Sequence, residues 1–163
     1  MRRRTVLGAT GAFAFGAPRA WANGEVDLAL VLAVDVSRSI DEEEARLQRE
    51  GYQAAMMHPQ VVAAITGGPS AAIAVAYVEW AGIQYQRLVI PWMRLAGAAD
   101  CAAWARILAD ASRDSMAWTS ISGALMMAGT VLADCPFAAP RRVVDVSGDG
   151  INNSGPPPET VRD

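Results

Sequence analysis

An unbroken apolar segment, residues 28–34, ends at the polar pentapeptide Asp35-Val36-Ser37-Arg38-Ser39. Its residues are aliphatic with no polar interruption, which is typical of a strand buried on both faces of a sheet. Side chains two residues apart project to the same side of an extended backbone, so Asp35, Ser37 and Ser39 can converge on one point. The segment therefore predicts a buried strand that ends in a group of side-chain oxygens.

The residue types in this group indicate which ligand it could hold. Three oxygen donors favour a hard cation, Mg²⁺ or Mn²⁺, over zinc. Because Asp35 is the one charged ligand among them, the metal would stay electron-poor and could accept an outside ligand. The alternative interpretation is local, since Ser39 or Asp41 is also placed to cap a helix that starts near Glu42. The pentapeptide alone fits both interpretations.

The rest of the chain alternates between helical and extended patterns. Helices are expected at about residues 42–57, 98–111 and 120–134, and further strands at residues 71–80, 85–91 and 142–147. This alternation defines the α/β class, here a doubly wound, mostly parallel sheet flanked by helices. The chain stops soon after the last strand, so we expect a fold without its final strands and helices. Prolines at 156–158 predict a flexible tail over residues 156–163.

A second polar segment, Ser147-Gly148-Asp149-Gly150, follows the strand at 142–147. In doubly wound sheets, ligands bind outside the carboxyl ends of the strands, where the strand order reverses. If this strand neighbours the first one, Asp35 and Asp149 flank that crevice. Thr119, in the loop before the helix at 120–134, is a third donor. The predicted metal site is therefore Asp35, Ser37, Ser39, Thr119 and Asp149.

These segments carry a resemblance to a known family. The DxSxS spacing at 35–39, Thr119 at the start of Thr119-Ser120-Ile121-Ser122-Gly123, and Ser147-Gly148-Asp149-Gly150 resemble a von Willebrand factor type A domain. The resemblance covers roughly residues 26–155, within an expected domain at 23–155. The segments Tyr77-Val78-Glu79-Trp80 and Asp149-Gly150-Ile151-Asn152-Asn153 further resemble an exported bacterial subgroup of unknown function, DUF1194.

The resemblance implies a Rossmann-like fold with a metal-ion-dependent adhesion site. In it, Ser37, Ser39 and Thr119 would coordinate Mg²⁺ or Mn²⁺ through their hydroxyls, and Asp35 and Asp149 would bind the metal or hold its waters. The metal's remaining position would accept an Asp or Glu carboxylate from a partner protein. Ser147 stands where the family often has threonine.

The first 22 residues have the pattern of a secretory signal peptide. Arg2-Arg3-Arg4 is followed by a short apolar segment, and Ala20-Trp21-Ala22 provides a cleavage site. The consecutive arginines resemble the twin-arginine export signal, although general secretory signals and uncleaved anchors also begin this way. We therefore expect a periplasmic or secreted protein with no membrane segment after cleavage.

Charge and cysteine content narrow the partners. Removing residues 1–22 takes four of the 14 basic residues and none of the 17 acidic ones, which leaves a formal charge of −7 and no lysine. This balance argues against nucleic acid and anionic membranes as partners. Cys101 and Cys135 form a disulfide in an oxidising compartment or remain two buried thiols, and the sequence fits both.

The expected function is an exported, divalent-cation-dependent protein-binding module of the adhesion type, not an enzyme. The scarcity of histidine, with only His58 just before Pro59 at an expected helix end, argues against Ser-His-Asp catalysis. Two alternatives remain: a metal-dependent phosphohydrolase with Asp35 as nucleophile, and a metal-free structural scaffold. Trp118 either borders the site or packs internally, and Arg38 either steers an acidic partner or is simply solvated.

Overall fold

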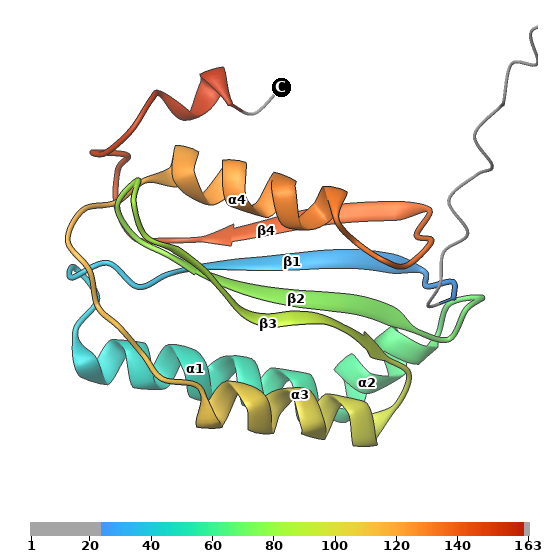
Figure 1. The fold of residues 1–163 in the computed structure, drawn as a ribbon. Coiled ribbons are helices and arrows are strands. Elements are labelled where there is room, and N and C mark those ends of the chain that lie inside the picture. Colours follow the sequence, from blue (N-terminus) through green and yellow to red (C-terminus); the bar gives the residue numbers. More distant parts are fainter. Residues whose placement is uncertain (1–23, 162–163) are drawn as a thin grey trace, which may run out of the picture.

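The computed structural model describes residues 24–161, so the proposed signal peptide at 1–22 lies outside the described residues. Within them, four strands form one sheet that lies between helices on both faces (Figure 1). The strands are β1 (Leu28–Asp35), β2 (Ile73–Trp80), β3 (Gln86–Leu95) and β4 (Arg141–Ser147). The helices are α1 (Glu42–Met57), α2 (Pro59–Thr66), α3 (Ala98–Asp110) and α4 (Ile121–Ala133), with a short 3-10 helix at Pro158–Thr160. The expected α/β class is confirmed.

The strand order is β3-β2-β1-β4. β1 is parallel to β2 on one side and to β4 on the other, whereas β3 is antiparallel to β2. The sheet is therefore mostly parallel, as expected, and β4 is an edge strand among the described residues. Because the chain passes from β1 to β2 on one side and later to β4 on the other, the order reverses at β1. The carboxyl ends of β1 and β4 meet at this reversal.

Two apolar layers hold the sheet between its helices. On one face, α1, α2 and α3 cover a core that includes Tyr77 and Trp104, whose rings meet edge to face at 5.8 Å between centroids. On the other face, α4 packs small residues such as Ala124 against Trp80 and β1. Aliphatic residues of β1 alternate between these two layers, which explains why the segment contains no polar interruption.

The cysteines occupy different faces of the sheet. Cys101 is buried in α3, and Cys135 is buried just after α4 on the opposite face. Both are free thiols. The sequence fitted either a disulfide or two buried thiols, and the structure has two buried thiols.

Three elements differ from the sequence expectation, all near prolines. Pro59 ends α1 as expected but also begins α2, because proline fits the first position of a helix, and His58 caps that helix. β3 continues through Pro91 to Leu95, because it is an edge strand and its pairing with β2 is irregular at this point. Pro158–Thr160 forms a 3-10 turn where we expected no regular structure.

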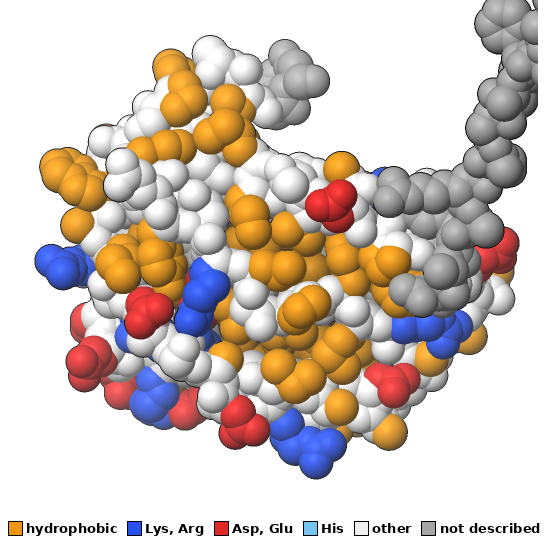
Figure 2. All heavy atoms as spheres, viewed as in Figure 1, with side chains coloured by type: hydrophobic (Ala, Val, Ile, Leu, Met, Phe, Trp, Pro, Cys, Tyr) orange, Lys and Arg blue, Asp and Glu red, His pale blue; other side chains and the backbone are white. Residues whose placement is uncertain are grey.

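Figure 2 shows apolar side chains gathered on the face that contains β3, between α4 and α3. Partly exposed residues on these three elements include Leu88, Ile107 and Met126. Acidic and basic side chains lie mostly around this area in the same view.

Candidate functional site

A connected set of polar side chains lies where β1 and β4 end. Asp35 is the last residue of β1, and the register of the two strands places Val34 opposite Ser147. The Ser37 backbone N–H donates to Asp35 Oδ1 at 2.7 Å. The hydroxyls of Ser37 and Ser39 are 2.9 Å apart, and Ser39 Oγ donates to Asp149 Oδ1 at 3.1 Å. The structure therefore brings four of the five predicted residues into one hydrogen-bonded chain.

Thr119, the fifth predicted residue, borders the same place. Its side chain is buried, and a Cβ built on Gly150 would lie 3.4 Å from Thr119 Oγ1. The Thr119 hydroxyl therefore faces the residue that follows Asp149. All five predicted residues thus come from three loops that meet at the carboxyl edge of the sheet.

Asn153 fixes the backbone of Thr119. Its Oδ1 accepts a hydrogen bond from Thr119 N–H at 2.7 Å, and its own N–H donates to Thr119 O at 2.9 Å. Ser154 N–H donates to the same carbonyl at 3.1 Å. Asn153 belongs to a segment that carries the family resemblance, but no role was predicted for it. The paired asparagines after the second polar segment were the signal that could have identified it.

Gly148 allows the loop after β4 to approach Asp35 closely. A Cβ at this position would lie 3.0 Å from the Trp80 ring and 3.1 Å from Asp35 Oδ2. Any larger residue would have to displace one of these two buried side chains. The absence of a side chain at Gly148 therefore allows the loop after β4 to pack directly against the buried Asp35.

Asp35 is the electrostatic centre of the site. It is fully buried, and its Oδ2 accepts no hydrogen bond among the described residues. Burial raises the pKa of the Asp35 carboxyl, the two hydrogen bonds from Ser37 lower it, and the nearby Asp149 charge raises it further. The net effect is a raised pKa, because desolvation disfavours the charged form.

These residues fit a divalent cation. A buried carboxylate oxygen without a donor is unfavourable, and a cation beside it would satisfy it. Two carboxylates and three hydroxyls provide the hard oxygen donors that Mg²⁺ and Mn²⁺ prefer. Within residues 24–161, no cluster of three or more His, Cys, Asp and Glu side chains was found, so a site here depends on hydroxyl donors.

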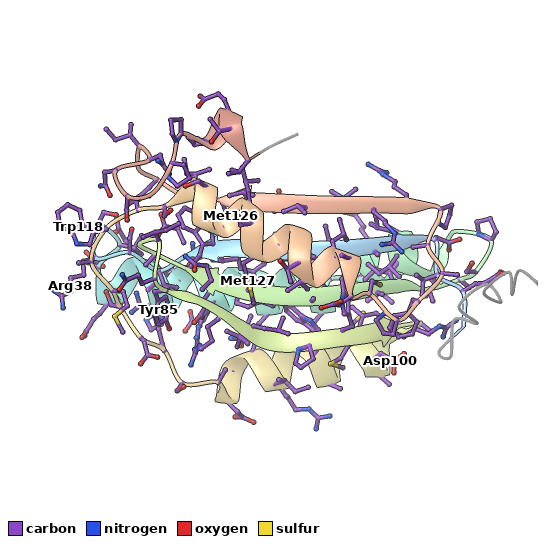
Figure 3. All side chains as sticks on the ribbon, turned by 45° about the horizontal axis from the view of Figure 1, so that its top comes forward. Arg38, Tyr85, Asp100, Trp118, Met126 and Met127 are labelled. Carbon is purple, nitrogen blue, oxygen red and sulfur yellow. The ribbon has the colours of Figure 1, made fainter. Side chains whose placement is uncertain are left out.

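Two residues whose roles the sequence left open lie at the rim. Trp118 precedes Thr119 and is 65% exposed, so it borders the site and is not a core residue. Arg38 is exposed too, and its backbone N–H donates to Met116 O at 2.9 Å. Figure 3 shows both side chains at the end of the molecule where β1 and β4 terminate.

The strand order and the helices on both faces define a doubly wound α/β domain with a cluster of polar side chains at the carboxyl edge of its sheet. The family model described as a protein of unknown function, DUF1194, matches residues 25–163. The chain belongs to this DUF1194 family. None of the curated proteins matches it.

Solved structures with a similar fold include two pilus proteins. The pilus adhesin SpaC from Lactobacillus rhamnosus GG aligns with 73% of this chain and 15% of its own, at 16% identity and a TM-score of 0.50. The vWF domain of the type V pili tip protein Mfa5 from Porphyromonas gingivalis aligns with 78% of this chain and 39% of its own, at 18% identity and a TM-score of 0.48. The chain thus spans well under half of either protein, and the similarity is one of fold.

No helix within residues 24–161 combines the length and apolar character needed to cross a bilayer.

Proposed function

We propose that this protein is an exported, divalent-cation-dependent protein-binding module of the adhesion type. The observation that carries the proposal is the hydrogen-bonded chain from Asp35 through Ser37 and Ser39 to Asp149, with one buried carboxylate oxygen left without a donor. Asp35, Ser37, Ser39, Thr119 and Asp149 are the residues that would hold Mg²⁺ or Mn²⁺. When bound, the cation supplies Lewis acidity that attracts an Asp or Glu carboxylate of a partner protein.

The chain's own residues prepare the site for this role. The Ser37 N–H orients the Asp35 carboxylate, and the Ser39 hydroxyl orients that of Asp149. Asn153 holds the Thr119 backbone in place, and Gly148 lets the loop after β4 pack against Asp35 and Trp80. The site offers two carboxylates and three neutral hydroxyls. If Asp149 or Asp35 binds the divalent cation through a water molecule, the ligands in direct contact neutralise only part of its charge. Such a cation favours one more anionic ligand.

Two further observations support an exported adhesion role. SpaC is a pilus adhesin and Mfa5 a pilus tip protein, and both contain a domain of this fold. The secretory pattern of residues 1–22 agrees with a place outside the cytoplasm, in the periplasm or beyond. The acidic composition that follows the signal disfavours nucleic acid as the partner.

The phosphohydrolase alternative fits the geometry less well. A nucleophilic carboxylate must reach a phosphorus atom, whereas Asp35 is fully buried beneath Gly148. The chain also contains no lysine that could hold a phosphate. These observations weigh against an enzyme and leave the metal-free scaffold as the simpler competitor.

Thermal unfolding tests the proposal directly. A ligand that binds only the folded state stabilises it, by about 2.7 kcal/mol at a hundredfold excess over its Kd. We expect Mg²⁺ or Mn²⁺ to raise the Tm of the wild-type protein by several degrees over EDTA, and to leave Asp35→Ala and Ser37→Ala unchanged. Ser70→Ala, at the opposite end of β2, is the matched control and should respond like the wild type.

Each competing function predicts a different result. A cooperative melt that ignores the metals would contradict the proposal and favour the scaffold. Metal-dependent hydrolysis of a generic phosphate ester, lost in Asp35→Ala, would favour the phosphohydrolase. Metal-dependent retention of an acidic protein ligand, without such hydrolysis, would support the binding module.

A further inference from the structure

A cavity of about 580 Å³ opens directly beside the proposed metal site. It lies between the connection from β2 to β3 and the loop that precedes α4. Ile83 and Tyr85 line it from the first side, and Met116 and Trp118 from the other. The lining side chains are uncharged, and most are apolar or aromatic.

The walls of this cavity are joined to the loops of the site by hydrogen bonds. Met116 O accepts from Arg38 N–H at 2.9 Å, which connects one wall to the DxSxS loop. Ser154 Oγ accepts from Ile83 N–H at 3.1 Å, while Ser154 N–H donates to Thr119 O at 3.1 Å. The cavity and the proposed metal site therefore share the loop before α4 and the segment after β4, and hydrogen bonds connect the other walls to these loops.

Trp118, in one wall of the cavity, has an energetically unfavourable backbone conformation. Its φ of 75° lies in the left-handed region, which is unfavourable for a residue with a side chain, and its indole is 65% exposed. Backbone strain of this kind occurs at ligand clamps and other functional positions. A large aromatic side chain held in a strained, exposed position is suited to contact a ligand.

Gly82 makes room for this arrangement from across the cavity. A Cβ at Gly82 would lie 2.9 Å from Ala117 O and 3.1 Å from Trp118 Cβ. The backbone of the β2–β3 connection therefore approaches the Trp118 loop as closely as a chain can. This contact fixes the distance between the two walls.

The chemistry of the walls indicates which side chain would enter. An indole, a phenol ring, a thioether and an isoleucine favour an aliphatic or aromatic group, which loses unfavourable contact with water on entering. The Tyr85 hydroxyl already donates to Asp114 Oδ2 at 3.2 Å, so its ring remains for packing. Figure 3 shows Arg38, Tyr85 and Trp118 at the same end of the molecule, where Arg38 adds a positive charge beside the cavity.

We infer that this protein binds an acidic residue of its partner together with a neighbouring large apolar residue, which occupies the cavity lined by Ile83, Tyr85, Met116 and Trp118. The inference rests on the proposed function, because the acidic residue would be held at the metal site. It adds the partner's recognition sequence: a carboxylate next to a phenylalanine or leucine.

Peptides of defined sequence test this inference. The probes are Ac-Gly-Gly-Asp-X-Gly-Gly-NH₂ with X as Phe, Leu or Gly, titrated into the full protein in excess Mg²⁺. We expect the Phe and Leu peptides to bind at least about tenfold more tightly than the Gly peptide, because each buries a large apolar side chain. Trp118→Ala should abolish this preference, so that the Phe, Leu and Gly peptides bind this variant with similar affinities. Met126→Ala removes another exposed apolar side chain, on α4, and should retain the preference.

A second probe separates this inference from the proposed function. N-acetyl-phenylalaninamide has no carboxylate, so it should shift the Trp118 indole NMR signal in EDTA as well as in Mg²⁺. If it does so while no peptide shows metal dependence, the cavity assignment stands and the metal-dependent function fails. If the peptides bind with Mg²⁺ but without preference for Phe or Leu, the cavity inference is overturned and the function stands. Absence of both responses would overturn both.

Discussion

At the scale of single residues, Asp35 dominates the energetics of the site. Its carboxyl is fully buried, its Oδ2 has no hydrogen-bond donor among the described residues, and Asp149 lies nearby. A charge in this position is unfavourable in the absence of a cation, because burial removes its hydration. The metal-free protein is therefore destabilised by the residue on which the proposed site is centred.

This cost predicts a pH-dependent effect of Asp35→Asn in EDTA. The pKa of Asp35 is raised in the folded state above its usual value of 3.8, so the folded protein binds this proton more tightly than the unfolded chain. The resulting stability is present below the usual pKa and is lost as pH rises through the raised pKa. We therefore expect Asp35→Asn to be more stable than the wild type at pH 7 and to lose this advantage in acid.

Urea unfolding of both proteins in EDTA between pH 4 and pH 8 measures this difference. Ser37→Ala is the control, because it removes a hydroxyl and keeps the Asp35 charge. A wild type that is as stable as Asp35→Asn at pH 7 would contradict the expected cost of burying the carboxylate.

Some features of the site could be predicted from local residue spacing, whereas others depend on contacts between distant residues. The spacing of Asp35, Ser37 and Ser39 on extended backbone was enough to predict that they converge, and the structure connects them by hydrogen bonds. The role of Asn153 was not predicted, because its bond to Thr119 joins residues 34 positions apart, and the paired asparagines at 152–153 do not indicate which residue they contact. The left-handed backbone of Trp118 was equally hidden, since tryptophan rarely adopts it.

At the scale of elements, the segment after β4 positions the loop before α4. Asn153 accepts from Thr119 N–H and donates to Thr119 O, so it fixes the backbone that presents the Thr119 hydroxyl. Outer residues that orient metal ligands typically contribute about 10- to 100-fold to affinity. We expect Asn153→Ala to weaken Mg²⁺ binding by about tenfold, and Asn153→Asp, which keeps the acceptor oxygen, to restore most of it.

Isothermal titration of Mg²⁺ into each variant measures this effect, with near-unchanged far-UV circular dichroism as the check on folding. An Asn153→Ala variant with wild-type Mg²⁺ affinity would remove Asn153 from the site. The proposed metal site itself would stand in that case, provided that Asp35→Ala still abolishes binding.

A buried ion cluster connects α1 to β2 and β3. Glu79 is fully buried and forms ion pairs with Arg49 of α1 and with Arg87 of β3, the latter at 2.8 Å. Arg49 also donates to the carbonyls of Ala111 and Ser112, just after α3. Removing one partner leaves the buried carboxylate poorly compensated, so we expect Arg49→Met to destabilise the protein by about 3 kcal/mol.

Arg46→Met provides the matched control on the same helix. Arg46 pairs with Glu43 and Glu50 on the exposed face of α1, where solvent screens the charges, so its loss should have little effect. Urea unfolding of the two variants compares them directly. Similar midpoints for Arg49→Met and Arg46→Met would show that the Glu79 cluster contributes no more than a surface pair.

The prolines show where element boundaries could not be predicted. Pro59 indicated the end of α1 correctly, but the start of α2 at the same residue depends on the His58 cap and on packing of Ile65 into the core. Pro91 suggested the end of β3, yet an edge strand with irregular pairing tolerates it. In both cases tertiary contacts override the local signal.

At the scale of the whole molecule, the sheet separates the two cysteines. Cys101 lies in the core beneath α3 and Cys135 beyond α4, with the sheet between them. The sequence showed two cysteines in an exported chain, where a disulfide is common, but it contained no information about which face each one occupies. That information comes from the strand order, which only the complete fold defines.

The two thiols therefore predict how the whole molecule opens. They are 1% and 3% exposed, and burial, together with the charge of Asp100, raises the pKa of the Cys101 thiol, so both should resist thiol reagents in the folded protein. We expect Ellman's reagent to label neither cysteine in native buffer and both in denaturant, without prior reduction. Titration of fewer than two thiols in denaturant, restored by reductant, would reveal a disulfide and contradict the fold. Native labelling at the rate of global unfolding, equal for Cys101→Ala and Cys135→Ala, would show that the two faces of the sheet open together, because a local opening would expose one thiol before the other.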